Sequence, residues 1–332
     1  MKKKCVILDD YQNAALSMAD WSAVSDRVDV LALREHIDNE DALVAALDGA
    51  EIAIIMRERT PFPARLFERL PALRLLITSG MRNASIDLAA AAARGVTVCG
   101  TGSGSEPPTE LAWALILGLA RQTVIENNAL RQGGPWQSTV GADLHGRQLG
   151  LLGLGKIGTR MARIGQAFGM RVVAWSPNLT QERADAAGAE FAPSKEALLE
   201  GSDFVSIHLV LGERTRGLLG AAELRRMRPH AYLINTSRAP IVDQAALIEV
   251  LEQERIAGAG LDVFDIEPLP AGHAFRRLPN VLATPHLGYV SQRNYRTYFS
   301  EAVQDIAAWL EHAPVRTLGS NPTATSNDRG RP

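Results

Sequence analysis

Cysteine is scarce in this sequence, with only two in 332 residues. Cys5 and Cys99 belong to no Cys-x-x-Cys pair and to no histidine-rich neighbourhood. Neither a disulfide framework nor a cysteine zinc site is therefore predicted. We expect both thiols to be small buried apolar groups in a reducing compartment. The histidines show no paired spacing, so no metal site is predicted.

An excess of charge of one sign is also missing. The sequence has 35 Lys and Arg against 37 Asp and Glu, a formal net charge of -2. This balance gives no electrostatic footprint for nucleic acid or for an anionic membrane surface. The longest apolar run, residues 111–120, is about half of a bilayer span. Residues 5–8 are too few for a signal-peptide core. We expect a soluble cytoplasmic protein that binds neither nucleic acid nor membranes.

What the sequence does have is a glycine-rich turn at residues 149–158, Leu-Gly-Leu-Leu-Gly-Leu-Gly-Lys-Ile-Gly. Gly153 permits a tight turn, Gly155 lets the backbone approach a pyrophosphate, and Gly158 allows a helix to pack closely on a strand. The anion would then lie at the helix N-terminus. A glycine turn without a ligand is the alternative. We predict a dinucleotide site.

The context of this turn supports the prediction. An apolar strand-like run precedes it, a helix is predicted after it, and a second strand at residues 171–175 completes a βαβ unit. The predicted helix has an apolar face and a polar face. The apolar face consists of Ile157, Met161, Ile164 and Phe168, and the polar face of Arg160, Arg163 and Gln166.

Strand-like and helix-like segments alternate along the chain, which predicts parallel sheets covered on both faces. Strands are predicted at residues 5–8, 28–33, 51–56, 73–78, 96–99, 149–152, 171–175, 204–208, 231–235, 258–263 and 281–283. Helices are predicted at residues 41–47, 64–70 and 87–93. The first strand opens onto Asp9-Asp10-Tyr11-Gln12-Asn13, which has no glycine to hold a phosphate.

The length predicts two domains. Residues 100–108, Gly-Thr-Gly-Ser-Gly-Ser-Glu-Pro-Pro, are predicted to be a linker. We predict an α/β fold of two Rossmann-like domains, with the nucleotide-binding domain inserted in a flavodoxin-like substrate domain. The predicted boundaries are 1–102 with 295–314 for the substrate domain, 103–294 for the nucleotide domain, and 315–332 for a flexible tail. An amphipathic helix with Phe299, Val303, Ile306 and Leu310 is expected to pack on the first domain.

A helix starting near Thr109 is apolar on nearly every face over residues 111–120, so we expect it to be buried all round. Packing within the chain or against a second subunit would both satisfy this. We favour the second and predict a homodimer through this helix. Trp113 and Trp136 are expected to be packing residues.

Three residues suited to chemistry on an anionic substrate each follow a predicted strand: Arg238, Glu267 and His286. In open α/β sheets, ligands bind beyond the carboxyl ends of strands. Hydride transfer at an alcohol carbon needs a proton donor and acceptor, and an anionic substrate needs a fixed cation. Alone, each residue has an ordinary alternative: a solvated arginine, a turn acid before Pro268, or a cap or core histidine.

Four motifs in order resemble the D-isomer-specific 2-hydroxyacid dehydrogenases, which include phosphoglycerate, glyoxylate/hydroxypyruvate, D-lactate and formate dehydrogenases. The resemblance extends from about residue 40 to 312. The motifs are Gly153-x-Gly155-x-x-Gly158, Asn235-Thr-Ser-Arg-Ala, Leu261-Asp-Val-Phe-x-x-Glu-Pro and Thr284-Pro-His.

The resemblance implies hydride transfer between a nicotinamide cofactor and a 2-oxo acid or D-2-hydroxy acid. Arg238 would bind the substrate carboxylate bidentately. His286 would give a proton to the substrate oxygen during reduction and take it during oxidation. Glu267 would orient the imidazole and favour its protonated form.

Further contacts follow from the same resemblance. Asp262 would contact the nicotinamide carboxamide. Backbone amides of Ser79, Gly80 and Met81 would hold the carboxylate, which would place the active site between the domains. Apart from the resemblance, Arg57 is a further substrate candidate, and Tyr289, three residues beyond His286, is either a packing residue or a substrate contact. The implied cofactor contacts are Gly153, Gly155, Lys156, Ile157, Gly158, Ser176, His208, Thr215, Thr236, Asp262 and Gly288.

The sequence departs from the family at the position that usually binds the adenosine ribose through an acid, which here is Ser176. Without a carboxylate the exclusion of a 2′-phosphate is lost, but no arginine is adjacent to bind one. We favour NAD and leave NADP open. An NADH-sensing corepressor with little turnover is the alternative function, and oxidation of a small inorganic or one-carbon anion is a third.

Three arginines near the expected substrate loop are candidates for a second anionic group on the substrate, such as a phosphate or a distal carboxylate. They are Arg57, Arg59 and Arg82. Alternatively they are surface residues or pair with Glu58, which stands where the family usually has a small polar residue.

Overall fold

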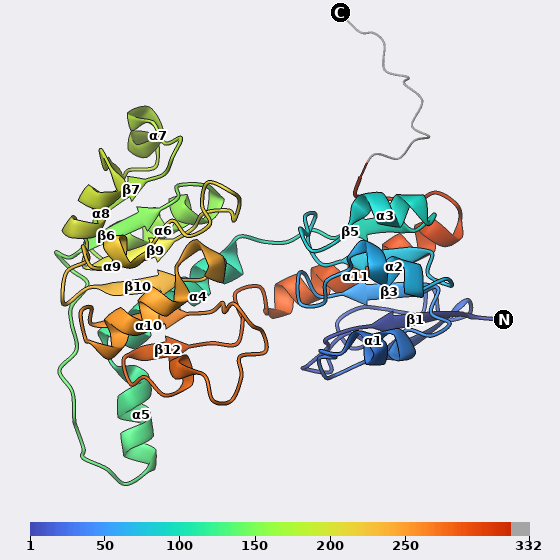
Figure 1. Ribbon diagram of the computed structural model, residues 1–332, viewed down its shortest axis with the longest axis horizontal. Coiled ribbons are helices and arrows are strands. Elements are labelled where there is room, and N and C mark those ends of the chain that lie inside the picture. Colours follow the sequence, from blue (N-terminus) through green and yellow to red (C-terminus); the bar gives the residue numbers. More distant parts are fainter. Residues whose placement is uncertain (320–332) are drawn as a thin grey trace, which may run out of the picture. The chain divides into compact units, whose positions relative to one another are not determined.

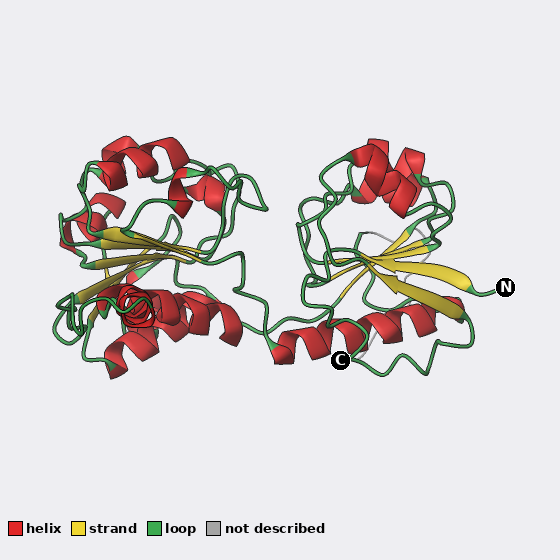
Figure 2. Ribbon diagram, turned by 90° about the horizontal axis from the view of Figure 1, so that it is seen from below, coloured by secondary structure: helices red, strands yellow, loops and turns green. Residues whose placement is uncertain are grey.

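The chain forms two compact α/β units in the computed structural model, which describes residues 1–319 (Figure 1). The first unit comprises Met1–Gly104 and the segment from Ser291 onward, and the second comprises Ser105–Val290. Each unit has one sheet with helices on both faces (Figure 2). The predicted α/β fold with two parallel sheets is confirmed. Over residues 1–319, no helix combines the length and apolar character needed to cross a membrane.

The first unit has a five-stranded parallel sheet in the order β2-β1-β3-β4-β5. The strands are β1 Lys3–Ile7, β2 Val28–Ala32, β3 Ile52–Ile55, β4 Leu75–Thr78 and β5 Thr97–Gly100. Every residue of β3 and β4 is buried, because helices cover both faces of a parallel sheet and select continuous apolar strands. The order places the carboxyl ends of β1 and β3 side by side at the point where the strand order reverses.

Four helices flank this sheet: α1 Glu40–Ala46, α2 Ala64–Arg69, α3 Leu88–Ala93 and α11 Gln292–Leu310. Asn39 and Asp87 accept hydrogen bonds from the first turns of α1 and α3, which fixes where these helices begin. As predicted, the apolar face of α11 packs on this unit. Its four predicted residues, Phe299, Val303, Ile306 and Leu310, are all buried.

The predicted tail begins too early. The Leu318 amide donates to the Val98 carbonyl at 2.7 Å, and the Gly100 amide donates to the Arg316 carbonyl at 3.0 Å, so this segment pairs with β5. The Arg316 guanidinium also bonds the buried Asp305 carboxylate at 2.9 Å. Pairing with the edge strand β5 uses only backbone groups. The polar side-chain composition of the predicted tail therefore gave no indication of this pairing. The rest of the predicted tail, residues 320–332, lies outside the described residues.

The second unit has a seven-stranded parallel sheet in the order β12-β11-β10-β9-β6-β7-β8. The strands are β6 Gln148–Leu152, β7 Arg171–Trp175, β8 Glu190–Phe191, β9 Phe204–Ile207, β10 Tyr232–Asn235, β11 Gly258–Leu261 and β12 Val281–Ala283. The strand order reverses between β6 and β9. The α-helices are α4 Glu106–Ala120, α5 Thr123–Arg131, α6 Lys156–Ala167, α7 Gln181–Ala186, α8 Lys195–Gly201, α9 Ala221–Leu224 and α10 Gln244–Glu252.

Two expectations about α4 need correction. The helix begins at Glu106, so the end of the predicted linker is helical, because prolines are tolerated in a first turn. Ala114 is exposed and Leu117 only partly buried, so the helix is not buried all round by its own chain. Trp113 is buried as expected, but Trp136 is 81% exposed, so it does not pack within its own chain.

The predicted apolar face of α6 is also wrong in detail. Of its four predicted residues only Met161 is buried, and Phe168 is exposed. The buried face is Gly158, Met161, Ala162 and Gly165. A Cβ on Gly165 would lie 3.0 Å from Leu149 Cδ2, so small residues let this helix approach the sheet closely. Hydrophobicity periodicity ranks large apolar residues first and therefore misses a face built from glycine and alanine.

Candidate active site

The glycine turn joins β6 to α6 at the point where the strand order reverses. Gly153 has φ 104°, and a Cβ there would lie 2.6 Å from the His208 carbonyl oxygen. A Cβ on Gly158 would lie 2.1 Å from the Gly153 carbonyl oxygen. Gly155 is exposed with open space around it, at the N-terminus of a twelve-residue helix. Two glycines are therefore required by packing, and the third leaves room for an anion.

Other predicted cofactor residues lie around this turn, at the carboxyl ends of neighbouring strands. Ser176 follows β7, His208 follows β9 and Thr236 follows β10. The His208 ring lies 2.8 Å from Ser206 Oγ, and burial lowers the pKa of His208 to about 4, so the imidazole is neutral. Thr215 Oγ1 donates to the Val210 carbonyl at 2.7 Å and fixes the loop after β9.

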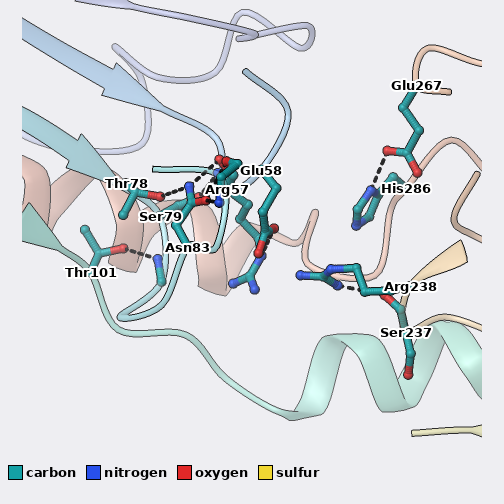
Figure 3. Close-up of polar contacts among 12 residues, drawn as sticks. Arg57, Glu58, Thr78, Ser79, Asn83, Thr101, Ser237, Arg238, Glu267 and His286 are labelled. Carbon is teal, nitrogen blue, oxygen red and sulfur yellow. Dashed lines mark hydrogen bonds and ion pairs between the residues drawn. The ribbon is translucent and has the colours of Figure 1, made fainter. Parts of the chain in front are cut away.

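Glu267 and His286 form a hydrogen-bonded pair, with 2.6 Å between Glu267 Oε2 and His286 Nδ1 (Figure 3). The other carboxylate oxygen, Oε1, accepts from the Phe264 amide at 2.8 Å, so the acid is held at both oxygens. The edge of the imidazole meets the Tyr289 ring at 5.4 Å between centroids. Because Nδ1 faces the carboxylate, Nε2 is the nitrogen that can exchange a proton with a substrate.

The Asp262 carboxylate fixes the loop that carries His286 by accepting hydrogen bonds from it. This carboxylate is fully buried and accepts from Thr284 Oγ1 at 2.7 Å, the Leu287 amide at 2.7 Å and the Gly288 amide at 2.8 Å. Burial raises the pKa of Asp262, while these hydrogen bonds act in the opposite direction. The loop conformation includes φ 52° at His286, an unusual value for a non-glycine residue. The contact of Asp262 with nicotinamide stays a prediction.

Arg238 follows β10, the neighbour of β11 and β12, so the three predicted catalytic residues follow three adjacent strands. The Asn235 side chain organises the turn before it, accepting from the Ser237 amide at 3.0 Å and donating to the Arg238 carbonyl at 3.1 Å. The Arg238 guanidinium donates to the Ser237 carbonyl at 2.7 Å (Figure 3). Its position is thus set by the Asn-Thr-Ser-Arg sequence itself.

The predicted substrate loop of the first unit follows β4. Ser79 Oγ accepts from the Arg57 amide at 2.9 Å (Figure 3). The Ser79 amide donates to the Ile55 carbonyl at 3.1 Å, and the Gly80 amide to Thr101 Oγ1 at 3.1 Å. A substrate carboxylate would therefore have to share these two amides with partners from the protein. Met81 is exposed.

Some supporting residues have no indication in the sequence. Asn83 donates to the Arg57 carbonyl at 2.7 Å and to Thr78 Oγ1 at 2.9 Å, and Thr101 holds the Gly80 amide. Asn83 is 26 residues from Arg57 and Thr101 is 21 residues from Gly80, and no local pattern connects these pairs. Among residues 1–319, no group of three or more His, Cys, Asp and Glu side chains gathers as a metal site would require.

Comparison with known proteins identifies this arrangement. Residues 113–288 match the model of the D-isomer specific 2-hydroxyacid dehydrogenase NAD binding domain. The chain belongs to this family. The matched region contains the glycine turn, Arg238, Glu267 and His286. The family and the relatives show an NAD-dependent oxidoreductase that acts on CH–OH donors, and they favour it over a corepressor.

Individual relatives agree with the family. The chain is 36% identical over 278 residues to a glyoxylate reductase of Korarchaeum cryptofilum, covering 82% of this chain and 80% of that protein. It is 33% identical to the D-3-phosphoglycerate dehydrogenase of Bacillus subtilis over 83% of this chain but only 53% of that protein. A crystal structure of a putative D-3-phosphoglycerate dehydrogenase oxidoreductase from Ralstonia solanacearum matches with TM-score 0.90 and 35% identity, covering 98% of both chains.

Proposed function

We propose that the protein reduces a 2-oxo acid to the D-2-hydroxy acid, with His286 as proton donor, Glu267 as its orienting acid and Arg238 as the carboxylate ligand. The observation that carries the proposal is the 2.6 Å bond between Glu267 and His286, on a loop fixed by Asp262. That pair gives the family's reaction a proton donor of defined orientation. Formate oxidation needs no such group, because it creates no alkoxide to protonate.

The protein's own residues would bind the substrate carboxylate and donate the proton in this reaction. Bound NADH would supply the hydride that adds to C2 of the substrate. Arg238 would bind the substrate carboxylate through two parallel hydrogen bonds and so fix the position of the neighbouring carbonyl. As negative charge develops on the carbonyl oxygen, His286 Nε2 would transfer its proton to that oxygen. Glu267 would stabilise the protonated imidazole before the transfer.

We propose that the cofactor lies along the glycine turn, with its pyrophosphate at the N-terminus of α6. The free space at Gly155 supports this placement. The proposed contacts are those predicted, namely Gly153, Gly155, Lys156, Ile157, Gly158, Ser176, His208, Thr215, Thr236, Asp262 and Gly288. Ser176 supplies no carboxylate against a 2′-phosphate, so NADPH should also support turnover. Buried free thiols at Cys5 and Cys99 support a reducing, cytoplasmic location.

A substrate panel tests this function. Glyoxylate, hydroxypyruvate, pyruvate and phosphohydroxypyruvate are each assayed with NADH and with NADPH, and chiral products are resolved. We expect NADH-dependent reduction of at least one acid, with only the D isomer formed wherever the product is chiral, and measurable activity with NADPH. An L product, or no reduction of any acid by a folded protein that binds NADH, would contradict the proposal.

We also propose that the protein is a homodimer, formed through α4 and through α5 with the loop that follows it. None of the nine residues of α5 is buried, and an isolated helix this short is unstable in water. In Figure 1, α5 projects from the rest of its unit. Large apolar side chains are exposed along α5 and its loop: Val124, Ile125, Leu130, Trp136 and Val140. A second copy would cover them.

Mass measurement checks the dimer. Sedimentation equilibrium of the wild type at micromolar concentration is expected to give twice the 35.9 kDa chain mass, and the double variant Leu130→Asp, Trp136→Ser is expected to shift toward the single chain. Leu16→Asp, at an exposed leucine of the first unit, is the control and should stay dimeric. A monomeric wild type, or a double variant that stays fully dimeric, contradicts this interface.

A further inference from the structure

We propose that Glu58 determines substrate specificity by neutralising Arg57, so that the substrate loop at residues 79–81 accepts 2-oxo acids with an uncharged distal end and disfavours those with a distal phosphate or carboxylate. This inference rests on the proposed function, and it names the substrate class of that site. Glu58 Oε2 lies 3.6 Å from Arg57 Nε. Both side chains are partly buried, where an ion pair is less screened than at the surface.

Of the three arginines considered as anion ligands, Arg57 has its guanidinium against Gly80 of the substrate loop, whereas Arg82 follows that loop directly. Arg82 is exposed. The Arg59 guanidinium donates to the Asp9 carbonyl at 3.0 Å and lies 4.5 Å from the centroid of the Tyr11 ring, beside the carboxyl end of β1. In contrast, a Cβ on Gly80 would lie 2.6 Å from Arg57 Nη1, so this guanidinium contacts the loop proposed to hold the substrate carboxylate.

Hydrogen bonds fix the backbone of Arg57, and this backbone sets the positions of the Arg57 and Glu58 side chains. It has φ 55°, in the left-handed region, and both its polar groups are used. Its amide donates to Ser79 Oγ at 2.9 Å, and its carbonyl accepts from Asn83 Nδ2 at 2.7 Å. Figure 3 shows Arg57 and Glu58, which follow β3, near Ser79 and Asn83, which follow β4. The ion pair is therefore held beside the substrate loop and is not a mobile surface contact.

The charge of this pair decides which distal group the loop accepts. Arg57 alone would attract a second anion on the substrate. With Glu58 beside it the pair has no net charge, and a phosphate or carboxylate would meet the Glu58 carboxylate as a like charge, which is costly in a partly desolvated site. A substrate whose distal group is a hydrogen atom or a hydroxyl group is not repelled by the Glu58 carboxylate. The structure thus favours acids such as glyoxylate or hydroxypyruvate.

The test compares specificity ratios rather than single rates. For the wild type and for Glu58→Gln, kcat/KM is measured with phosphohydroxypyruvate, 2-oxoglutarate, hydroxypyruvate and glyoxylate at saturating NADH. Glu58→Gln keeps the side-chain volume and removes the charge. We expect the ratio of distally anionic to uncharged substrates to rise about 10- to 100-fold, because a repulsion is removed and Arg57 is released.

Two further variants make the result specific. Glu68→Gln removes an equal charge from an exposed position on α2 and should leave the ratio unchanged. Adding Arg57→Gln to Glu58→Gln should reduce the gain, because only the loss of the Glu58 repulsion then remains. An unchanged ratio in Glu58→Gln, or a gain that is undiminished without Arg57, overturns the inference. A wild type that reduces neither these four acids nor pyruvate instead contradicts the proposed function, so the two failures are distinguishable.

Discussion

Replacing His286 with glutamine lowers kcat for every accepted 2-oxo acid by about 10²- to 10⁴-fold, the range that general acid catalysis contributes. Glutamine retains much of the volume and can still donate a hydrogen bond, but it cannot deliver a proton. Because Glu267 is held at both oxygens and His286 at Nδ1, the structure has one imidazole nitrogen prepared for that delivery. Steady-state kinetics followed through NADH oxidation measure the loss.

The partner of this histidine supplies a graded control. Glu267→Gln keeps a hydrogen-bonding group against Nδ1 but removes the charge that stabilises the imidazolium, so its loss of kcat should be smaller than that of His286→Gln. NADH binding, measured by fluorescence titration, should show that the cofactor site is intact. A His286→Gln variant with near-normal kcat would refute the assignment.

Replacing Arg238 with lysine lowers kcat/KM by about 10²- to 10³-fold although the charge is kept. An ammonium group cannot form the two parallel hydrogen bonds that fix a carboxylate, and a small displacement of the reacting carbonyl is costly for the rate. Arg238→Ala should lose still more, because neither charge nor geometry remains. The loss should be similar for all 2-oxo acids, since every one of them carries the carboxylate.

A matched control lies at the opposite end of the same strand. Arg228 precedes β10, has a side chain that is 41% exposed, and donates to the Glu200 carbonyl at 2.9 Å. Arg228→Lys makes the same chemical change in the same unit, and it should keep kcat/KM within about twofold, as distant surface substitutions usually do. If Arg238→Lys is as active as Arg228→Lys, the substrate carboxylate is bound elsewhere.

Much of the fold could be predicted from the sequence because strand signals are local. Continuous apolar runs such as that of β3 are buried on both faces, and their positions follow from composition alone. The same is true of the predicted catalytic residues, since Arg238, Glu267 and His286 each follow a strand and parallel strands end at one edge of a sheet. Strand adjacency then brings together residues that are distant in the sequence.

What could not be predicted depends on long-range packing. The buried face of α6 is defined by how closely the helix approaches the sheet, which favours glycine and alanine over larger apolar residues. Asp262 looked like a cofactor ligand from its motif, but its three hydrogen bonds to residues 284–288 are visible only in the structure. The pairing of Leu318 with Val98 uses backbone groups, which carry no sequence signal.

The division of the chain has a consequence for its synthesis. The second unit is continuous in sequence, so all of its strands are available once Val290 has left the ribosome. The first unit has its sheet by Gly100, but α11 and the segment that pairs with β5 are translated only after the whole second unit. Until then the core face that α11 covers and the β5 edge have no cover from these segments, and such surfaces promote aggregation. The first unit is therefore completed only after the second, and during that interval its sheet is where a chaperone would be needed most.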